Sequence, residues 1–173
     1  MNFFLLGYMG SGKSTIGKQL SKTLSCKFID LDAYIEEKEN CSISEIFKNK
    51  GEIYFRKIEN KYLKEVVNET APSIIALGGG TPCYGNNMEI IKSSKFAKSI
   101  YLRVSIPFLV ERLFVEKAKR PLIAHIETKK ELTEFIGKHL FERTAYYSEC
   151  DITIGTDLLS EKEITDRILR DLF

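Results

Sequence analysis

Hydrophobic residues along the chain form two kinds of pattern, short continuous runs and stripes that repeat every three to four residues. A short apolar run is typical of a strand buried on both faces, and a stripe is typical of an amphipathic helix. Runs that predict strands occupy residues 3–6, 27–30, 73–77, 99–104 and 151–154. Helices are predicted after the first run, from Ser42, over about 52–68, around 88–94, from Ser105, over about 129–147 and from Ser160. Ser42 and Ser160 each begin a capping box with a glutamate three residues later, and Gly51 predicts a break before the helix at 52–68.

Strands and helices therefore alternate along the whole chain. This alternation predicts an α/β fold in which a five-stranded parallel sheet is flanked by helices on both faces. A chain of 173 residues is expected to form a single domain over residues 1–173. Two segments depart from the simple alternation, at about 31–60 and about 114–128. We expect them to be a substrate-binding insertion and a mobile lid.

Composition excludes several classes of protein. Hydrophobic residues make up 43% and charged residues 29% of the chain, and the net charge is +2. These values are typical of a soluble globular protein, and no basic block suggests a nucleic-acid surface. No apolar stretch is long enough to cross a membrane. The four cysteines include no Cys-x-x-Cys pair, so we expect free thiols in a reducing cytoplasm. His125 and His139 share no ligand spacing with other residues, and both are expected to be structural.

Residues 7–15 read Gly-Tyr-Met-Gly-Ser-Gly-Lys-Ser-Thr, which matches the phosphate-binding P-loop. Glycines allow positive φ angles and let backbone N–H groups approach an anion closely. Lys13 can reach the terminal phosphates, and the Ser14 hydroxyl can bind Mg²⁺. The alternative is an ordinary glycine turn. However, the loop follows an apolar run and precedes a helical stripe that starts at Ile16, as a P-loop requires. The sequence therefore predicts nucleotide binding.

Two acids, Asp30 and Asp32, follow the run at 27–30. P-loop NTPases usually carry a second acid that supports Mg²⁺ at the end of an apolar strand, and the run at 73–77 ends in glycines instead. Residues two apart on an extended chain point to opposite sides. One acid is therefore expected to support the metal and the other to orient or deprotonate an acceptor hydroxyl. The alternative is a pair of solvated carboxylates that cap a helix.

Further candidates lie at the predicted ligand edge of the sheet and in the two unusual segments. Residues 78–80 are three consecutive glycines, whose backbone amides can approach a ligand; the alternative is a flexible turn. Arg56 and Arg143 are placed on predicted helices, where surface arginines are also common. Arg120 belongs to a basic run. This run is either a solvated loop or a mobile segment whose arginine neutralises the charge on a transferred phosphoryl group.

Together these residues resemble the shikimate kinase family, which is related to the nucleoside monophosphate kinases. The resemblance covers essentially the whole chain. Its motifs are the P-loop at 7–15, Asp30-Leu31-Asp32, Phe55-Arg56-x-x-Glu59, Leu77-Gly78-Gly79-Gly80, Arg120-Pro121-Leu122 and Arg143-x-x-x-Tyr147-x-Glu149. Many families share the P-loop, and the other motifs in this order make the match specific.

The resemblance implies phosphorylation of the 3-hydroxyl of shikimate by ATP with Mg²⁺, in the pathway to chorismate and the aromatic amino acids. It implies catalytic roles for Asp32, Lys13 and Arg120. The implied ATP-binding residues are Gly10, Ser11, Gly12, Lys13, Ser14, Thr15, Arg112 and Arg120. The implied shikimate-binding residues are Asp32, Arg56, Gly78, Gly79, Gly80 and Arg143. Ser14 and Asp30 would hold Mg²⁺. The implied enzyme is a cytoplasmic monomer with no nucleic-acid or membrane partner.

Two other readings of the same residues remain open at this stage. A small-molecule kinase of the gluconate or nucleoside monophosphate type would share the P-loop, although the Asp-x-Asp and the three glycines favour shikimate. A nucleotide-binding switch would need an Asn-Lys-x-Asp motif for guanine, and the most similar stretch, at 49–52, precedes a helix instead of following a strand. The chain also has Ala145-Tyr146 where the family usually has Pro-Leu before its tyrosine, which affects the expected position of Arg143.

Overall fold

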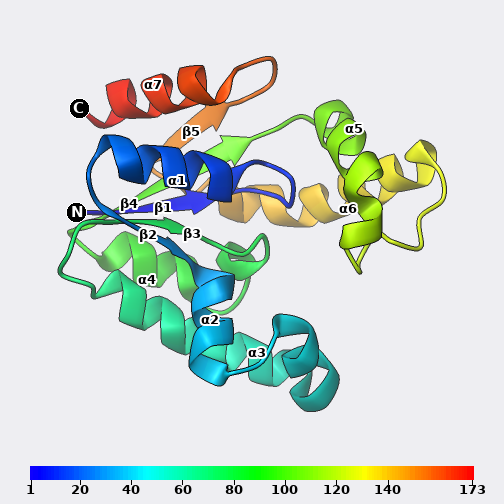
Figure 1. The fold of residues 1–173 in the computed structure, drawn as a ribbon, viewed down its shortest axis with the longest axis horizontal. Helices are drawn as coiled ribbons and strands as arrows, with labels where there is room; N and C mark the ends of the chain where they lie inside the picture. Colours follow the sequence, from blue (N-terminus) through cyan, green and yellow to red (C-terminus); the bar gives the residue numbers. More distant parts are fainter.

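A computed structural model describes all 173 residues as one parallel sheet enclosed by helices (Figure 1). The sheet has the order β2-β3-β1-β4-β5, and all pairs are parallel. Its strands are β1 (Asn2–Leu6), β2 (Lys27–Asp30), β3 (Ser73–Ala76), β4 (Ala97–Arg103) and β5 (Ile152–Gly155). The five-stranded parallel sheet predicted from the apolar runs is confirmed.

Seven helices connect or follow these strands. They are α1 (Lys13–Thr23), α2 (Leu31–Glu39), α3 (Ile43–Val67), α4 (Asn87–Ser93), α5 (Ile106–Glu116), α6 (Lys129–Tyr147) and α7 (Glu161–Leu172). Short 3₁₀ turns, η1 (Thr81–Cys83) and η2 (Lys117–Lys119), follow β3 and α5. Capping boxes begin at Ser42, Thr128 and Ser160. The two that the sequence predicted, at Ser42 and Ser160, are confirmed. The pattern did not predict α2.

Both faces of the sheet are buried, because alternate residues of the central strand are apolar on each side. Phe3 and Leu5 pack with α1 and α7 in one hydrophobic cluster. Phe4 and Leu6 pack with α2, α3 and α4 in another. Figure 1 shows α1 and α7 on one face of the sheet and α3 and α4 on the opposite face. A third cluster joins α5 to α6 around Leu109 and Ile136.

Gly51 interrupts α3 with φ 81° and ψ 174°. A residue with a Cβ rarely adopts these angles. The long element is therefore two helical segments joined by a bend, in agreement with the break that the sequence predicts at Gly51. The bend lets the first segment lie beside α2 as a projection from the sheet (Figure 1).

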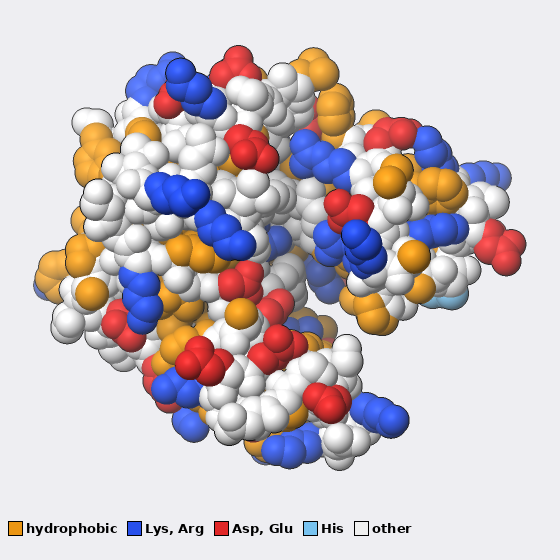
Figure 2. All heavy atoms as spheres, viewed as in Figure 1, with side chains coloured by type: hydrophobic (Ala, Val, Ile, Leu, Met, Phe, Trp, Pro, Cys, Tyr) orange, Lys and Arg blue, Asp and Glu red, His pale blue; other side chains and the backbone are white.

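The carboxyl ends of the parallel strands meet at one edge of the sheet, where ligands bind in open α/β folds. The P-loop, Asp30 and the three glycines follow β1, β2 and β3 at this edge. Figure 2 shows the molecule hollowed between the α2–α3 side and the α5 side, with acidic and basic side chains along both walls. No helix combines the length and the hydropathy that a membrane crossing requires.

Candidate active site

The P-loop has the backbone geometry that its glycines predict. Gly10 and Gly12 have φ angles of 77° and 87°, in the region that favours glycine. A Cβ at Gly10 would also stand 2.9 Å from Cδ2 of Leu113 on α5. Gly12 directly precedes α1. The loop therefore turns its backbone into the N-terminal end of a helix, which favours bound anions.

Lys13 lies across this loop. Its Nζ donates hydrogen bonds to the carbonyl oxygens of Gly7 at 2.8 Å and Tyr8 at 3.0 Å. Burial lowers the pKa of Lys13 to about 8, while the carboxylates of Asp32 and Asp30 act to raise it. The ammonium group is still mostly charged at neutral pH. A phosphate group in the loop would raise the pKa of Lys13, which favours the charged form, and would offer Nζ an anionic hydrogen-bond acceptor.

Asp30 both caps a helix and faces the P-loop. One carboxylate oxygen accepts from the Ser14 hydroxyl at 2.8 Å. The other accepts from the backbone N–H groups of Asp32 at 3.2 Å and Ala33 at 3.4 Å, at the start of α2. The capping alternative and the metal-site prediction are thus compatible, since each uses a different oxygen.

The pair Ser14 and Asp30 has the chemistry of a magnesium site. Magnesium in kinases is held by one or two protein oxygen ligands, with phosphates and waters completing the octahedron. No group of three or more His, Cys, Asp or Glu side chains could hold a metal by itself. A hydroxyl and a carboxylate at the mouth of a phosphate loop fit magnesium bound together with a nucleotide.

Asp32 lies in the first turn of α2. The prediction that Asp30 and Asp32 point to opposite sides of an extended chain was therefore wrong. The two acids still face different partners because the chain turns into a helix between them. A Cβ at Gly78 would stand 3.0 Å from Oδ1 of Asp32, so a larger residue at this position would crowd the carboxylate. Burial, followed by the charges of Asp30 and Glu59, raises the pKa of Asp32 to about 6.

Two adjoining cavities, each of about 360 Å³, meet at Asp32. The first contains the P-loop, and we call it the phosphate cavity. The second lies between α3, the glycines after β3 and the α5–α6 connection, and we call it the acceptor cavity. Both are lined by Met9, Asp32, Gly78, Gly79 and Arg120. A ligand in the acceptor cavity would therefore face a phosphate group across the Asp32 carboxylate.

Arg56 projects from α3 into the acceptor cavity. Its Nη1 donates to Glu59 Oε1 at 2.9 Å, one helical turn along. Glu59 is buried, and its second oxygen accepts from Thr81 Oγ1 at 2.7 Å. Glu59 belongs to the Phe55-Arg56-x-x-Glu59 motif, but it was not among the predicted site residues. Its spacing of three from Arg56 on one helix was the available signal.

Arg143 reaches the same cavity from α6. A Cβ at Gly79 would stand 3.6 Å from its Nη1, and its guanidinium carbon lies 5.7 Å from the centre of the Tyr8 ring. Tyr147, one turn further, donates its hydroxyl to the Gly79 carbonyl at 2.5 Å. Thus α6 is attached to the glycine segment beside its arginine, despite the Ala145-Tyr146 departure.

The arginines of the α5 side line the phosphate cavity. Arg112 Nη1 donates to the carbonyl oxygen of Gly10 at 3.2 Å. Arg120 lines both cavities and forms an ion pair with Glu116 at 2.8 Å. An exposed pair of this kind is worth little and is easily exchanged for a phosphate. Arg120 can therefore change partners without a large cost.

The remaining candidates divide between the two cavities. The phosphate cavity is lined by Gly10, Gly12, Lys13, Ser14, Thr15 and Asp30, and Gly80 lines the acceptor cavity. Ser11 lines neither, because its side chain is buried under the loop. Residues that the sequence did not indicate include Ile43 and Phe47 in the acceptor cavity. His139 bonds the Tyr8 hydroxyl at 2.9 Å and His125 is exposed, so neither lines these cavities.

Comparisons with known proteins find the same family by sequence and by structure. The family model described as shikimate kinase matches residues 9–173. A shikimate kinase of Flavobacterium johnsoniae is 47% identical over 165 residues, which cover 95% of each chain. A crystal structure of shikimate kinase from Bacteroides thetaiotaomicron superposes with a TM-score of 0.91 at 34% identity, over 99% of this chain and 98% of that one.

A second solved structure, a shikimate kinase of Acinetobacter baumannii in complex with shikimate, is also similar. Its TM-score is 0.85 at 30% identity, over 99% of this chain and 92% of that one. A deoxyadenosine kinase of M. mycoides, at 20% identity and a TM-score of 0.59, shares the fold. The fold predicted from the sequence is therefore that of known small-molecule kinases.

Proposed function

The chain belongs to the shikimate kinase family, and we propose that its two cavities transfer the γ-phosphoryl group of ATP to the 3-hydroxyl of shikimate. The products are shikimate 3-phosphate and ADP. One observation supports the residue assignment above all. A single carboxylate, Asp32, lines both a phosphate cavity built on the P-loop and an acceptor cavity that holds two arginines.

Shikimate is a small ring with several hydroxyl groups and one carboxylate. Planar guanidinium groups recognise a carboxylate through paired charge-assisted hydrogen bonds. We assign the substrate carboxylate to Arg56 and Arg143, which line the acceptor cavity together, and the ring to the surface of Gly78, Gly79 and Gly80. This orientation directs a ring hydroxyl towards Asp32.

Asp32 would accept a hydrogen bond from the acceptor hydroxyl and take up its proton as the phosphoryl group transfers. A raised pKa suits this role, because the carboxylate is ionised at neutral pH yet basic enough to receive a proton. Lys13, the loop amides and Arg120 would stabilise the negative charge on the transferred group. Arg112 would contribute to the nucleotide site from α5.

Ser14 and Asp30 would hold Mg²⁺, which supplies charge neutralisation at the phosphates. Residues 31–60 form the proposed substrate-binding insertion, and residues 114–128 form the proposed lid, which carries Arg120. We propose that the enzyme acts as a monomer. All four cysteines are free, as we expect for a protein of the reducing cytoplasm.

A substrate panel tests the proposed function. Release of ADP is measured with ATP and Mg²⁺ in the presence of shikimate, gluconate or nucleoside monophosphates. Shikimate is expected to support turnover and the others only background rates. Lys13→Met, checked for folding by circular dichroism, is expected to abolish most of the activity. Turnover of gluconate or a nucleotide in place of shikimate would overturn the assignment of the acceptor.

A further inference from the structure

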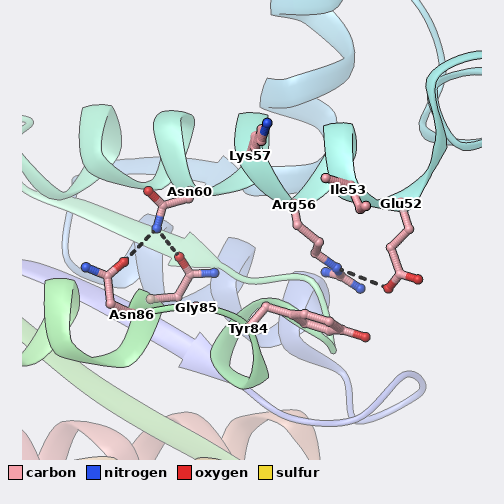
Figure 3. Close-up of a pocket in the computed structure, with 9 residues that line it drawn as sticks. Glu52, Ile53, Arg56, Lys57, Asn60, Tyr84, Gly85 and Asn86 are labelled. Carbon is pink, nitrogen blue, oxygen red and sulfur yellow. Dashed lines mark hydrogen bonds and ion pairs between the residues drawn. The ribbon is translucent and has the colours of Figure 1, made fainter.

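An exposed tyrosine lies behind the proposed substrate arginine. The ring of Tyr84 stacks on the guanidinium group of Arg56, with 3.6 Å between the Arg56 Cζ atom and the ring centroid. The Phe55 ring lies at 5.1 Å from the same atom. Figure 3 shows the Tyr84 ring directly beneath the guanidinium group, between the loop after η1 and α3. Neither the sequence motifs nor the functions proposed above give Tyr84 a role.

Hydrogen bonds within the protein fix Arg56 only in part. Glu59 accepts from Nη1, and Glu52 Oε1 lies 3.6 Å from Nε, which is too far for a hydrogen bond. Nε is the only buried side-chain nitrogen or oxygen without a hydrogen-bond partner in the chain. A single hydrogen bond at one end does not by itself fix the orientation of the guanidinium plane. The stacked ring restricts that rotation, since a guanidinium group packs flat on an aromatic face.

The surrounding chain keeps the ring in this place. Asn60, one turn after Arg56 on α3, donates to the side-chain oxygens of Asn86 at 3.0 Å and Asn87 at 2.8 Å. The loop that carries Tyr84 is thereby tied to the helix that carries Arg56. A Cβ at Gly80 would stand 3.0 Å from Arg56 Nη2 and 3.4 Å from Tyr84 Cε2. The third glycine of the segment therefore leaves room for the stacked pair.

Arg56 forms part of the wall between two hollows. One is the acceptor cavity, and the other is an open groove of about 660 Å³ lined by Glu52, Lys57, Asn60 and Tyr84 among others. Without the ring, the guanidinium group could move into this groove towards Glu52, away from the acceptor cavity. Restriction before binding improves affinity by lowering the entropy lost when the ligand is bound.

We propose that Tyr84 is a positioning residue, which holds Arg56 by cation–π stacking in the orientation that receives the substrate carboxylate. The inference rests on the proposed function, because it concerns how the acceptor is bound. It predicts a selective effect on shikimate affinity. The reacting groups at Asp32 and the P-loop are not touched by Tyr84.

The test compares Tyr84→Leu, Tyr84→Met and Tyr84→Phe with the wild-type enzyme. Stacking of this strength predicts that Leu and Met each raise the KM for shikimate about 3- to 30-fold. The kcat and the KM for ATP should stay within about twofold of the wild-type values. Phenylalanine keeps the aromatic face, and the Tyr84 hydroxyl forms no hydrogen bond within the protein. Tyr84→Phe should therefore keep the KM for shikimate within about twofold of the wild-type value.

Tyr54→Leu is the matched control. Tyr54 is a second tyrosine under a cation, with Lys50 Nζ 4.4 Å from its ring centroid, and it lies on α3 outside both cavities. Its substitution should leave the KM for shikimate unchanged. The double variant Arg56→Ala/Tyr84→Leu should have the same KM as Arg56→Ala alone, because a positioning residue has no effect once the group it positions is removed.

The outcomes separate this inference from the proposed function. If the wild type fails to phosphorylate shikimate, the proposed function and this inference fall together. If Arg56→Ala raises the KM while the folded Leu and Met variants of Tyr84 do not, only the inference is overturned. It is also overturned if Tyr84→Leu raises the KM equally in the presence and absence of Arg56. That result would mean that Tyr84 acts on the substrate or the fold by another route.

Discussion

Burial and the charges of Asp30 and Glu59 raise the pKa of Asp32 to about 6. Its ionisation at neutral pH therefore lowers the stability of the folded protein. The same property makes it a suitable base. Asp32→Asn retains the size and part of the hydrogen bonding but cannot accept the proton. We expect turnover to fall about 10²- to 10⁴-fold, measured by ADP release at saturating substrates, with little change in the Kd for ATP.

The wild-type kcat/KM for shikimate should fall with acidification below about pH 6, as Asp32 becomes protonated. A profile that stays flat from pH 8 to pH 5 would contradict the role of Asp32 as a base. Loss of ATP binding in Asp32→Asn, with normal turnover of the bound ATP, would assign Asp32 to the metal instead.

The raised pKa also predicts how stability depends on pH. A carboxyl group whose pKa is higher in the folded state destabilises the fold when it is ionised. For Asp32 this destabilisation disappears as the pH falls from the folded-state pKa of about 6 towards 3.8, the ordinary pKa of an aspartate. Asp32→Asn should therefore unfold at a higher temperature than the wild type at pH 8, by about 2–10 °C for a gain of about 1–3 kcal/mol. Calorimetry at pH 4 should show a much smaller difference.

Arg143 tests the identity of the substrate as well as a residue role. Loss of one partner from a buried charged pair costs about 2–4 kcal/mol, which corresponds to about 30- to 1000-fold in kcat/KM. Arg143→Ala should raise the KM for shikimate steeply and leave the Kd for ATP nearly unchanged. Arg143→Lys should recover only part of the loss, since an ammonium group makes a single point contact.

A shikimate analogue with a neutral group in place of the carboxylate supplies the control for Arg143. It should be a poor substrate of the wild type, and the mutation should harm its turnover much less than that of shikimate. The comparison isolates the interaction of the arginine with the carboxylate. Equal losses for both compounds would show that Arg143 does not recognise the carboxylate.

At the scale of elements, the bend at Gly51 decides where the first segment of α3 lies. That segment brings Ile43 and Phe47 to the acceptor cavity. No atom lies within 4 Å of a Cβ built at Gly51, so the obstacle to another residue is the backbone conformation and not a clash. Gly51→Ala should cost about 1–3 kcal/mol of stability and raise the KM for shikimate.

Thermal unfolding and steady-state kinetics of Gly51→Ala would check both effects. Gly85→Ala, at a φ of 53° with no atom near a built Cβ, is a control for the melting temperature alone, because Gly85 adjoins Tyr84. An unchanged melting temperature for Gly51→Ala would show that the bend is not maintained in solution.

At the scale of the whole molecule, the acceptor cavity is bounded on one side by α3 and on the other by the proposed lid. Lys119, Arg120, Pro121 and Leu122 supply the lid side of that wall. Lys117 and Lys119 also offer trypsin two cleavage sites in this segment, whereas the bond between Arg120 and Pro121 resists the protease. A non-hydrolysable ATP analogue with shikimate should slow cleavage there at least several-fold, as the lid closes on the ligands. Arg120→Ala should show less protection. Equal cleavage rates with and without ligands would contradict closure.

The P-loop, the strand pattern and most of the candidate residues could be predicted from the sequence because each depends on local rules. Nine consecutive residues form the phosphate loop, and apolar runs identify strands wherever both faces of a sheet are covered. Gly51 and the capping boxes at Ser42 and Ser160 likewise indicated where helices bend or begin. The helix α2 escaped prediction because its apolar stripe is weak, and it begins with the two acids that drew attention as a metal site.

Local patterns in the sequence do not determine which of these residues meet, and the tertiary structure does. Arg56, Arg143 and Asp32 are far apart in the sequence, and the sheet order together with the attachment of Tyr147 to Gly79 brings them to one cavity. The role of Tyr84 depends on the distance between its ring and the guanidinium group of Arg56. No sequence pattern encodes this distance, because it results from the packing of α3 against the loop after η1. The residue types thus determine the chemistry available to the protein, and the folded arrangement determines which groups act together.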